Sequence, residues 1–192
     1  MKITQRIAKI IRIITTAPFA ATFLCTLLLL LDKVAFRSYW HYAAALFFLA
    51  LLPLMAYPTA ALVPSIKKKG RKGQRNLAVI FSVIGYIGGF LFALLAKGTP
   101  TEEVLYCTYL ISGAGIAVCT VFRFKVSGHA CGISGPVAKL VEFVGPWFLF
   151  GYILLIPTIW SSLKLKRHSI LELLAGTILP WIALYVSMAI FL

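Results

Sequence analysis

Acidic side chains are scarce in this chain, which has five Asp and Glu residues against 19 Lys and Arg among 192 residues. Charged residues of both signs make up only 12% of the sequence, roughly half of their share in soluble domains. The sequence has no cluster of carboxylates that would hold a divalent cation. These shortages argue against a soluble domain and against a metal centre built from carboxylates.

Cysteines are also few, and none of them has the paired spacing of a metal site (Cys25, Cys107, Cys119 and Cys131). We interpret them as small buried hydrophobic residues and expect neither a metal nor a cofactor. The formal net charge of +14 would suit nucleic acid, but the polar loops are too short for a domain that reads it. We therefore expect no nucleic-acid partner.

Apolar residues make up 61% of the chain, and its mean hydropathy is +0.95. They form runs of about 20 residues without strict alternation, the length that a membrane-spanning helix needs. In a bilayer such runs form helices, because every backbone polar group must be satisfied internally. The sequence predicts an all-α, polytopic membrane helical bundle in one domain, 1–192, with six to seven transmembrane or half-depth helices. Its lipid environment makes membrane lipids partners by default, and its oligomeric state is open.

Seven candidate spans follow along the chain, at about Ile10–Leu31, Trp40–Val63, Leu77–Ala96, Val104–Phe122, Gly128–Val144, Pro146–Trp160 and Ser169–Leu192. We read the first as a retained helix and not as a signal peptide, because it is too long for the apolar part of such a peptide. The fifth and sixth are short, with Gly145-Pro146 as the break between them. One long helix over Val137–Trp160 is the alternative and gives six spans.

Three polar motifs lie at predicted helix ends: the basic run Lys67–Arg75, the tripeptide Ser127-Gly128-His129, and the segment Trp160–Gly176. We call the membrane surface that holds Lys67–Arg75 face A and the opposite surface face B. The hairpin of the third and fourth spans returns the tripeptide to face A. Two short spans then return His168 to face A, whereas one long helix would carry it about 30 Å away. A shared site therefore requires seven helices or half-depth segments.

The charges favour this two-faced arrangement. Face B would hold Asp32, Glu102 and Glu103 with few cations. By the rule that cytoplasmic loops carry the excess of Lys and Arg, face A is predicted to be cytoplasmic, and we expect the plasma membrane of a prokaryote. Face A would hold most of the basic residues: Lys2, Arg6, Lys9, Arg12, the Lys67–Arg75 loop, Arg123, Lys125, Lys164, Lys166 and Arg167.

His168 and Glu172 stand four residues apart at the start of an apolar run, which places both side chains on one helical face. A carboxylate in that position can accept the Nδ1 proton of the imidazole and leave Nε2 free to attack. The cations just before them (Lys164, Lys166 and Arg167) indicate an anionic substrate. Elsewhere, we interpret His41 as an interfacial anchor and Lys139 with Glu142 as a pair on one helix.

Together the three motifs resemble the type-2 phosphatidic acid phosphatase superfamily, whose patterns are Lys-x6-Arg-Pro, Pro-Ser-Gly-His and Ser-Arg-x5-His-x3-Asp. Lys68 and Arg75 match the first motif, the tripeptide ending at His129 matches the second, and Ser161, His168 and Glu172 stand in the third. The resemblance covers 68–176 in motif order and implies a phosphatase-like core at about 64–192, preceded by two helices at about 10–63.

The resemblance implies a metal-independent lipid phosphatase that works through a phosphohistidine. His168 would attack phosphorus, Glu172 would orient its ring, and His129 would protonate the leaving oxygen. The substrate would be a phosphorylated lipid of the phosphatidic acid, phosphatidylglycerol phosphate or polyprenyl diphosphate type. The phosphate itself would be bound by Lys68, Arg75, Ser127 and Gly128.

Four positions depart from the family patterns. Asn76 and Val126 replace prolines, and Glu172 replaces an aspartate that is one methylene shorter. Ser162 replaces the arginine of the third motif, and a serine cannot reproduce the bidentate fork of a guanidinium. Lys164 or Arg167 is the candidate substitute. The alternative function is a catalytically degenerate relative that binds or transports phosphorylated lipids.

Overall fold

The structure is a computed structural model that describes residues 3–192, with the side chain of Arg71 left out. Helices form nearly all of this part of the chain, and no strand occurs in it. The chain is therefore an all-α helical bundle, as predicted. Its elements are α1 (Ile3–Ile14), α2 (Ala17–Leu31), α3 (Tyr39–Leu46), the π-helical turn η1 (Phe47–Leu51), α4 (Leu52–Leu62), α5 (Pro64–Lys68), α6 (Gly70–Leu95), α7 (Pro100–Val121), α8 (Gly128–Phe143), the 3-10 helix η2 (Pro146–Leu154), α9 (Leu155–Lys164) and α10 (Ile170–Phe191).

Five helical segments in the described part are long and apolar enough to cross a membrane: Tyr39–Leu62, Lys72–Leu95, Pro100–Val121, Pro146–Lys164 and Ile170–Phe191. The bent pair α1 and α2 makes a sixth. Large apolar side chains such as those of Leu95 and Ile156 lie exposed on their outer surfaces, which suits contact with lipid tails. The chain is an integral membrane protein.

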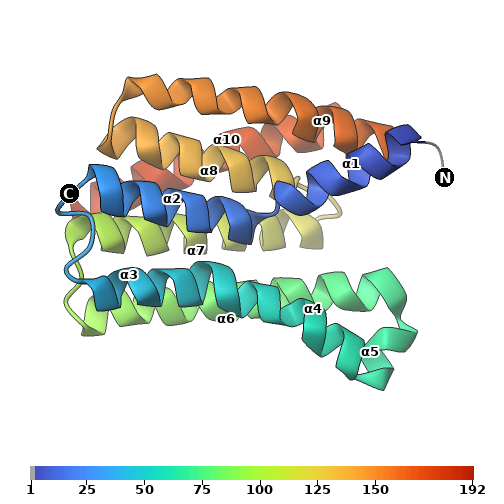
Figure 1. Ribbon diagram of the computed structural model, residues 1–192, viewed down its shortest axis with the longest axis horizontal. Helices are drawn as coiled ribbons and strands as arrows, with labels where there is room; N and C mark the ends of the chain where they lie inside the picture. Colours follow the sequence, from blue (N-terminus) through green and yellow to red (C-terminus); the bar gives the residue numbers. More distant parts are fainter. Residues whose placement is uncertain (1–2) are drawn as a thin grey trace.

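α8 runs alongside these segments in the bundle without being one of them (Figure 1). With 16 residues, α8 is shorter than the usual spanning length. Gly145 adopts φ +154° and separates α8 from η2, a conformation that favours glycine. The long-helix alternative over Val137–Trp160 is therefore wrong, and two short segments lie there.

The first predicted span is also wrong in one respect. The sequence predicted one span over about Ile10–Leu31 with a kink at Pro18, but the helix starts earlier, the chain breaks after Ile14, and α1 and α2 meet at an angle of 47°. Pro18 lies in the first turn of α2, where the missing N–H of proline costs no helical hydrogen bond. α1 is consequently a separate element, and it packs against α9.

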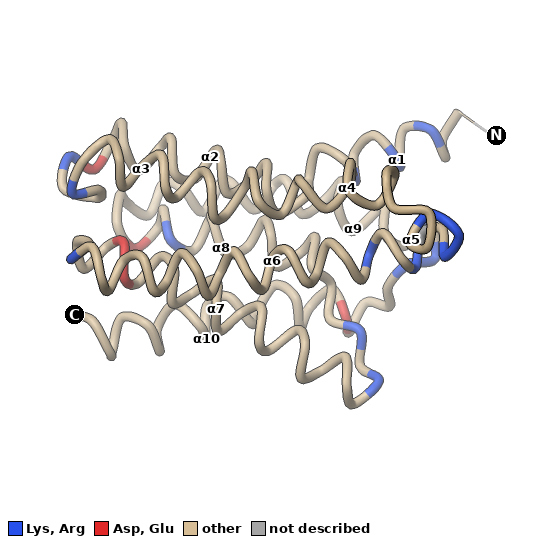
Figure 2. Tube along the Cα trace, turned by 90° about the horizontal axis from the view of Figure 1, so that it is seen from below, with Lys and Arg blue, Asp and Glu red and all other residues tan. Residues whose placement is uncertain are grey.

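Charged residues gather at the two ends of the bundle (Figure 2). One end carries α1, α5 and the connections before α8 and α10, and we identify it with face A. The other end carries the acidic residues Asp32 and Glu102 together with the turn between α6 and α7. The predicted face A residue Lys2 lies outside the described residues.

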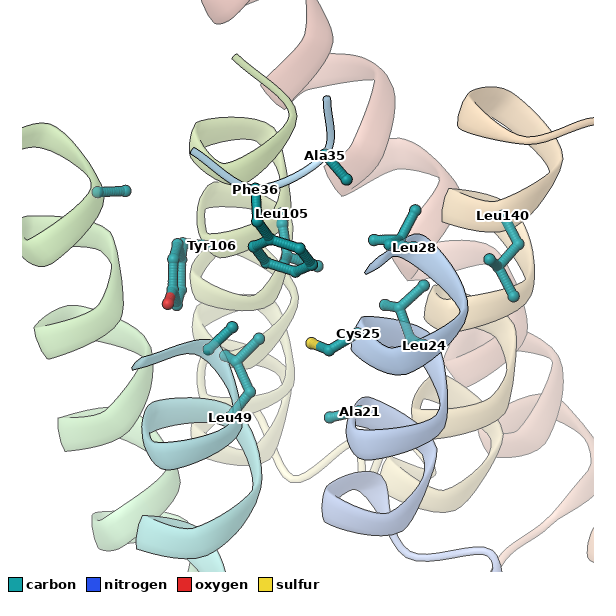
Figure 3. Close-up of a cluster of buried hydrophobic side chains, with 12 residues drawn as sticks. Ala21, Leu24, Cys25, Leu28, Ala35, Phe36, Leu49, Leu105, Tyr106 and Leu140 are labelled. Carbon is teal, nitrogen blue, oxygen red and sulfur yellow. The ribbon is translucent and has the colours of Figure 1, made fainter. Parts of the chain in front are cut away.

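The largest group of buried apolar side chains joins α2 to the centre of the bundle (Figure 3). Leu24 and Leu28 of α2 are fully buried and belong to the same cluster as Leu105 and Tyr106 of α7. Burial of a leucine side chain contributes about 2 kcal/mol. This packing anchors α2, and through α2 it fixes where α1 ends. A second group holds α8, α9 and α10 together through Ala130, Leu155 and Leu173.

Candidate functional site

The third motif lies where α9 ends and α10 begins. Ser169 caps α10: its hydroxyl accepts the backbone N–H of Glu172, and the Glu172 carboxylate accepts the backbone N–H of Ser169 at 3.1 Å. This reciprocal capping box satisfies two N–H groups that the helix start would otherwise leave unpaired. The same carboxylate oxygen lies 3.1 Å from Nδ1 of His168. Glu172 therefore both starts the helix and orients the imidazole.

The hydrogen bonds of His168 determine which of its nitrogens carries the proton. Nδ1 lies 3.1 Å from the carbonyl oxygen of Lys125 as well as 3.1 Å from the Glu172 carboxylate. A carbonyl oxygen can only accept, so Nδ1 is the donor. The lone pair of the neutral ring is consequently on Nε2. The side chain is 15% exposed, which leaves the ring within reach of a ligand.

The second motif joins the third through the backbone. Ser127 caps α8 by accepting the N–H of Ala130, and its own backbone N–H donates to the carbonyl of Glu172 at 3.0 Å. Gly176 of α10 faces this junction, where a Cβ would meet the Ser127 carbonyl oxygen at 2.5 Å. The start of α8 and the start of α10 are therefore in direct contact. Ser127 is fully buried, whereas Gly128 is exposed.

His129, in the first turn of α8, contacts the bend between α1 and α2. Its Nδ1 donates to the carbonyl oxygen of Thr15 at 3.1 Å, which leaves the lone pair on Nε2. Burial first, and then the charge of Arg12, lower the pKa of His129 to about 4, although the Thr15 carbonyl raises it. The charge of His168 also lowers this pKa, so the two imidazoles lie close enough to interact. In the absence of an anion, His129 is neutral at pH 7.

A shallow pocket of about 420 Å³ opens beside His168. Glu172 and Leu163 contribute to its wall. Three cations also line it: Lys125, Lys166 and Arg167. Lys166 has φ +50° in the turn after α9, a conformation that costs about 1 kcal/mol for a residue with a Cβ. The pocket combines an imidazole nitrogen that carries a lone pair with a concentration of positive charge, which attracts anions.

The first motif is not brought into contact with the histidines. Lys68 ends α5 and Arg75 lies in the second turn of α6, and both are exposed. α5 packs against α4 and α6. Within residues 3–192 no hydrogen bond or ion pair joins either cation to His129 or His168. The motif lies at the same end of the bundle as the histidines, and its role in phosphate binding stays a prediction.

Arg12 is the residue of this region that the sequence analysis did not identify as a site residue. Its Nη1 donates to the hydroxyl of Ser162 at 2.8 Å, across 150 positions of the chain. Ser162 is fully buried, and Arg12 is half-buried. The sequence offered only a basic residue in an N-terminal helix, because the bend that turns α1 onto α9 has no clear signal beyond Thr15-Thr16 and Pro18.

A second polar cluster lies at the face B end. His41 is buried, and its Nδ1 lies 2.6 Å from the carboxylate of Glu102, which is fully buried. The interpretation of His41 as an interfacial anchor is therefore wrong. Lys139 does not pair with Glu142 either: its ammonium donates to the Thr101 carbonyl and lies 3.8 Å from the centre of the Phe143 ring. These partners come from distant segments, which periodicity along one helix cannot reveal.

Within the described part of the chain, no group of three or more His, Cys, Asp or Glu side chains is arranged to hold a metal ion. The arrangement at face A instead offers two imidazoles whose Nε2 atoms carry lone pairs, surrounded by basic side chains. Comparison with protein-family models, with curated proteins and with solved structures finds no match to this chain.

Proposed function

We propose that this protein is an integral membrane phosphatase that removes a phosphate or diphosphate group from a lipid through a phosphohistidine intermediate. The observation that carries the proposal is the double hydrogen bond of His168 Nδ1, to the Lys125 carbonyl and to Glu172. It fixes the tautomer whose Nε2 lone pair can attack phosphorus. The basic pocket beside it supports an anionic substrate.

In the proposed reaction, Nε2 of His168 forms a bond to phosphorus while the bond between phosphorus and the lipid oxygen breaks. Glu172 stabilises the charged imidazole that results. His129 donates a proton to the departing oxygen. Water then attacks phosphorus, the bond to Nε2 breaks, and inorganic phosphate leaves with His168 restored. No step requires a metal.

The state of His129 supports an order of events. Its pKa of about 4 keeps it neutral before substrate binds. A phosphate dianion beside it would offset the charge of Arg12, because an opposite charge favours the protonated ring. We infer that His129 gains its proton together with the substrate and then delivers it to the leaving group.

A membrane lipid is the substrate class that suits this site. The pocket is shallow and lies at one end of a bundle whose helices expose apolar side chains to lipid. A substrate with an apolar tail can remain in the bilayer while its phosphate reaches the end of the bundle. The charge bias supports a cytoplasmic site in a prokaryotic plasma membrane.

Phosphate release from lipids in detergent micelles tests the function. The panel is phosphatidic acid, phosphatidylglycerol phosphate and a polyprenyl diphosphate, with a soluble phosphate monoester as comparison. We expect release from at least one lipid, and a loss of roughly 1,000-fold or more in His168→Ala, as for removal of a nucleophile. Lys33→Ala, at the opposite end of the bundle, is the control and keeps full activity.

The intermediate has its own signature. Wild-type protein quenched during turnover of a radiolabelled lipid retains label that survives alkali and is lost in acid, as expected of a phosphohistidine. Activity that persists in His168→Ala contradicts the proposed nucleophile. Binding of phosphorylated lipids without any phosphate release favours the second candidate, a degenerate relative that binds or transports them, for which Ser162 in place of an arginine is the supporting observation.

A further inference from the structure

We propose that Arg12 is a phosphate-binding residue of the face A site, supplied by α1 and held in position by the hydroxyl of Ser162. The inference rests on the proposed function and adds a residue to it that lies outside the three sequence motifs. It assigns a role to α1, an element that the phosphatase-like core at 64–192 does not include.

The contact between Arg12 and Ser162 joins two ends of the chain at one place. Nη1 of Arg12 donates to Oγ of Ser162 at 2.8 Å. Ser162 lies in α9 and is fully buried, so its hydroxyl is a fixed point. A guanidinium has five N–H donors in a rigid fork, and the bond to Ser162 occupies one of them. The hydroxyl thus fixes the position of the guanidinium, whose planar fork matches two oxygens of a tetrahedral oxyanion.

The same turn of chain also holds His129. Thr15, three residues after Arg12, accepts the Nδ1–H of His129 through its carbonyl. Arg12 lies one helical turn before Thr15, and its charge lowers the pKa of that imidazole. The end of α1 consequently provides both a positioning contact for His129 and a cation beside it.

Positive charge is concentrated in this part of the molecule. Arg12 and His168 both act on His129 in the direction expected of like charges, and Lys125, Lys166 and Arg167 add positive charge nearby. Like charges gathered at one place repel one another. A phosphate dianion bound among them converts that repulsion into attraction, which is a physical reason for such a cluster. Cations of this kind stabilise the charge that develops during phosphoryl transfer.

Arg12 also supplies a guanidinium at the place where Ser162 stands instead of the arginine of the third motif. The third motif has an arginine where this chain has Ser162, and the guanidinium bound to that hydroxyl comes from α1 instead. The two candidates from the sequence are placed differently. Lys164 is exposed, and Arg167 lines the pocket beside His168 and donates to Ser162 through its backbone N–H, at the carbonyl and not at the hydroxyl. α1 also presents exposed Ile3, Ile7 and Ile10 with Arg6 and Lys9, a pattern typical of a helix at the membrane interface.

The experiment measures lipid phosphatase activity and inorganic phosphate binding for four variants of the full chain in detergent. Arg12→Ala removes the guanidinium, and Arg12→Lys keeps the charge but loses the fork. Arg6→Ala removes an exposed cation from the same helix and is the matched control. The double variant Arg12→Ala with Ser162→Arg moves a guanidinium onto α9.

We expect Arg12→Ala to lower kcat/KM roughly 100-fold, as does loss of one donor to a developing oxyanion, and to weaken phosphate binding. Arg12→Lys should lie between Arg12→Ala and wild type, and Arg6→Ala should match wild type. The double variant should regain at least about ten-fold of the lost kcat/KM. A role of Arg12 that only fastens α1 to α9 would not be rescued in this way, because the double variant lacks that link.

The inference is overturned if Arg12→Ala keeps kcat/KM and phosphate affinity within two-fold of wild type, a result that leaves the proposed phosphatase intact. If wild-type protein releases phosphate from no lipid, the proposed function fails. The phosphate affinity of the variants then tests by itself whether Arg12 binds phosphate. If Arg12→Ala does not fold, Arg12→Lys and the double variant decide. Weak phosphate binding by Arg12→Lys together with recovery in the double variant supports the inference. Phosphate binding by Arg12→Lys as tight as in wild type overturns it.

Discussion

The two histidines at face A are held in the same tautomer by different means. His168 donates from Nδ1 to a carboxylate and a carbonyl, whereas His129 donates from Nδ1 to the carbonyl of Thr15 alone. A carboxylate partner stabilises a charged ring more than a carbonyl does. This asymmetry suits the roles that we propose for the two rings, a nucleophile and a proton donor, because only the nucleophile would bear charge in a covalent intermediate.

The protonation of His129 should depend on a bound anion. Its pKa is about 4 without a ligand, so the ring is neutral above that pH. Sulfate, a tetrahedral dianion whose charge stays constant between pH 4 and 8, should raise this pKa because it opposes the charges of Arg12 and His168. Since a higher pKa in the complex means that binding takes up a proton, sulfate should bind more tightly as pH falls towards 4.

Nuclear magnetic resonance of labelled histidine side chains in detergent checks this prediction. The titration midpoint of His129, assigned by its absence in His129→Gln, should rise by at least one pH unit at saturating sulfate. His41, at the far end of the bundle, should not respond and is the internal control. An unchanged His129 midpoint with sulfate bound would mean that this ring does not face the anion.

The sequence predicted the contacts of a site residue correctly where its partner is close to it along the chain. The spacing of four residues gave the contact of His168 with Glu172, which the structure confirms at 3.1 Å. It did not reveal that Lys125 shares the same nitrogen, nor that Arg12 reaches Ser162. Those contacts depend on how helices pack, and hydrophobic periodicity carries no information on which distant side chain fills a given place.

At the scale of elements, the close approach of α10 to the start of α8 determines the geometry of the site. Gly176 allows α10 to lie against the Ser127 carbonyl, and the Ser127 N–H to reach the Glu172 carbonyl. His168 and Glu172 belong to one helix start and His129 to the other. Any separation of the two helices would therefore change the distance between the two imidazoles.

Gly176→Ala should disturb this junction. The new Cβ would lie 2.5 Å from the Ser127 carbonyl oxygen, which is backbone and cannot rotate away. We expect a loss of about 1–3 kcal/mol of stability, as for overpacking, and at least a ten-fold fall in phosphate release, since a displacement of about 1 Å can cost more than that. Thermal unfolding and activity in detergent measure the two effects.

Gly135→Ala is the matched control, because it adds the same methyl group to the same pair of helices. Its Cβ would lie 3.5 Å from Pro180, an ordinary van der Waals distance. This variant should keep both stability and activity near those of wild type. Equal behaviour of the two variants would show that the close approach at Gly176 does not govern the site.

The boundaries of the helices were predictable from the sequence where glycine and proline mark their ends. Gly145-Pro146 correctly divided two short segments, which a run of apolar residues would have merged. A kink was predicted at Pro18, whereas the chain breaks slightly earlier, after Ile14, because apolar residues continue through this region and Thr15-Thr16 is a weak signal. The error matters, since this bend is what carries Arg12 to α9.

At the scale of the whole molecule, the two ends of the bundle differ in the kind of polar group that they hold. Face A carries exposed cations around two histidines, whereas the face B end holds the buried His41–Glu102 pair and buried Lys139. Buried pairs of this kind restrict the conformations of a bundle. The asymmetry is consistent with chemistry at face A and a fixed structure at face B.

The orientation of the molecule decides from which side of the membrane a substrate head group arrives. The excess of Lys and Arg predicts that face A is cytoplasmic. Ser65→Cys in α5 and Lys33→Cys before α3 place exposed thiols at faces A and B. Cys119→Ser provides the background, because the other cysteines are buried (Cys25, Cys107 and Cys131).

A maleimide that cannot cross membranes should label Lys33→Cys in intact cells, and Ser65→Cys only after the membrane is permeabilised. Both variants should be labelled equally in detergent, which controls for thiol reactivity. The opposite pattern in cells would mean that the cations of face A do not set the topology. Since those cations line the pocket beside His168, that result would assign them to anion binding alone and would direct the search for a substrate to the outer leaflet.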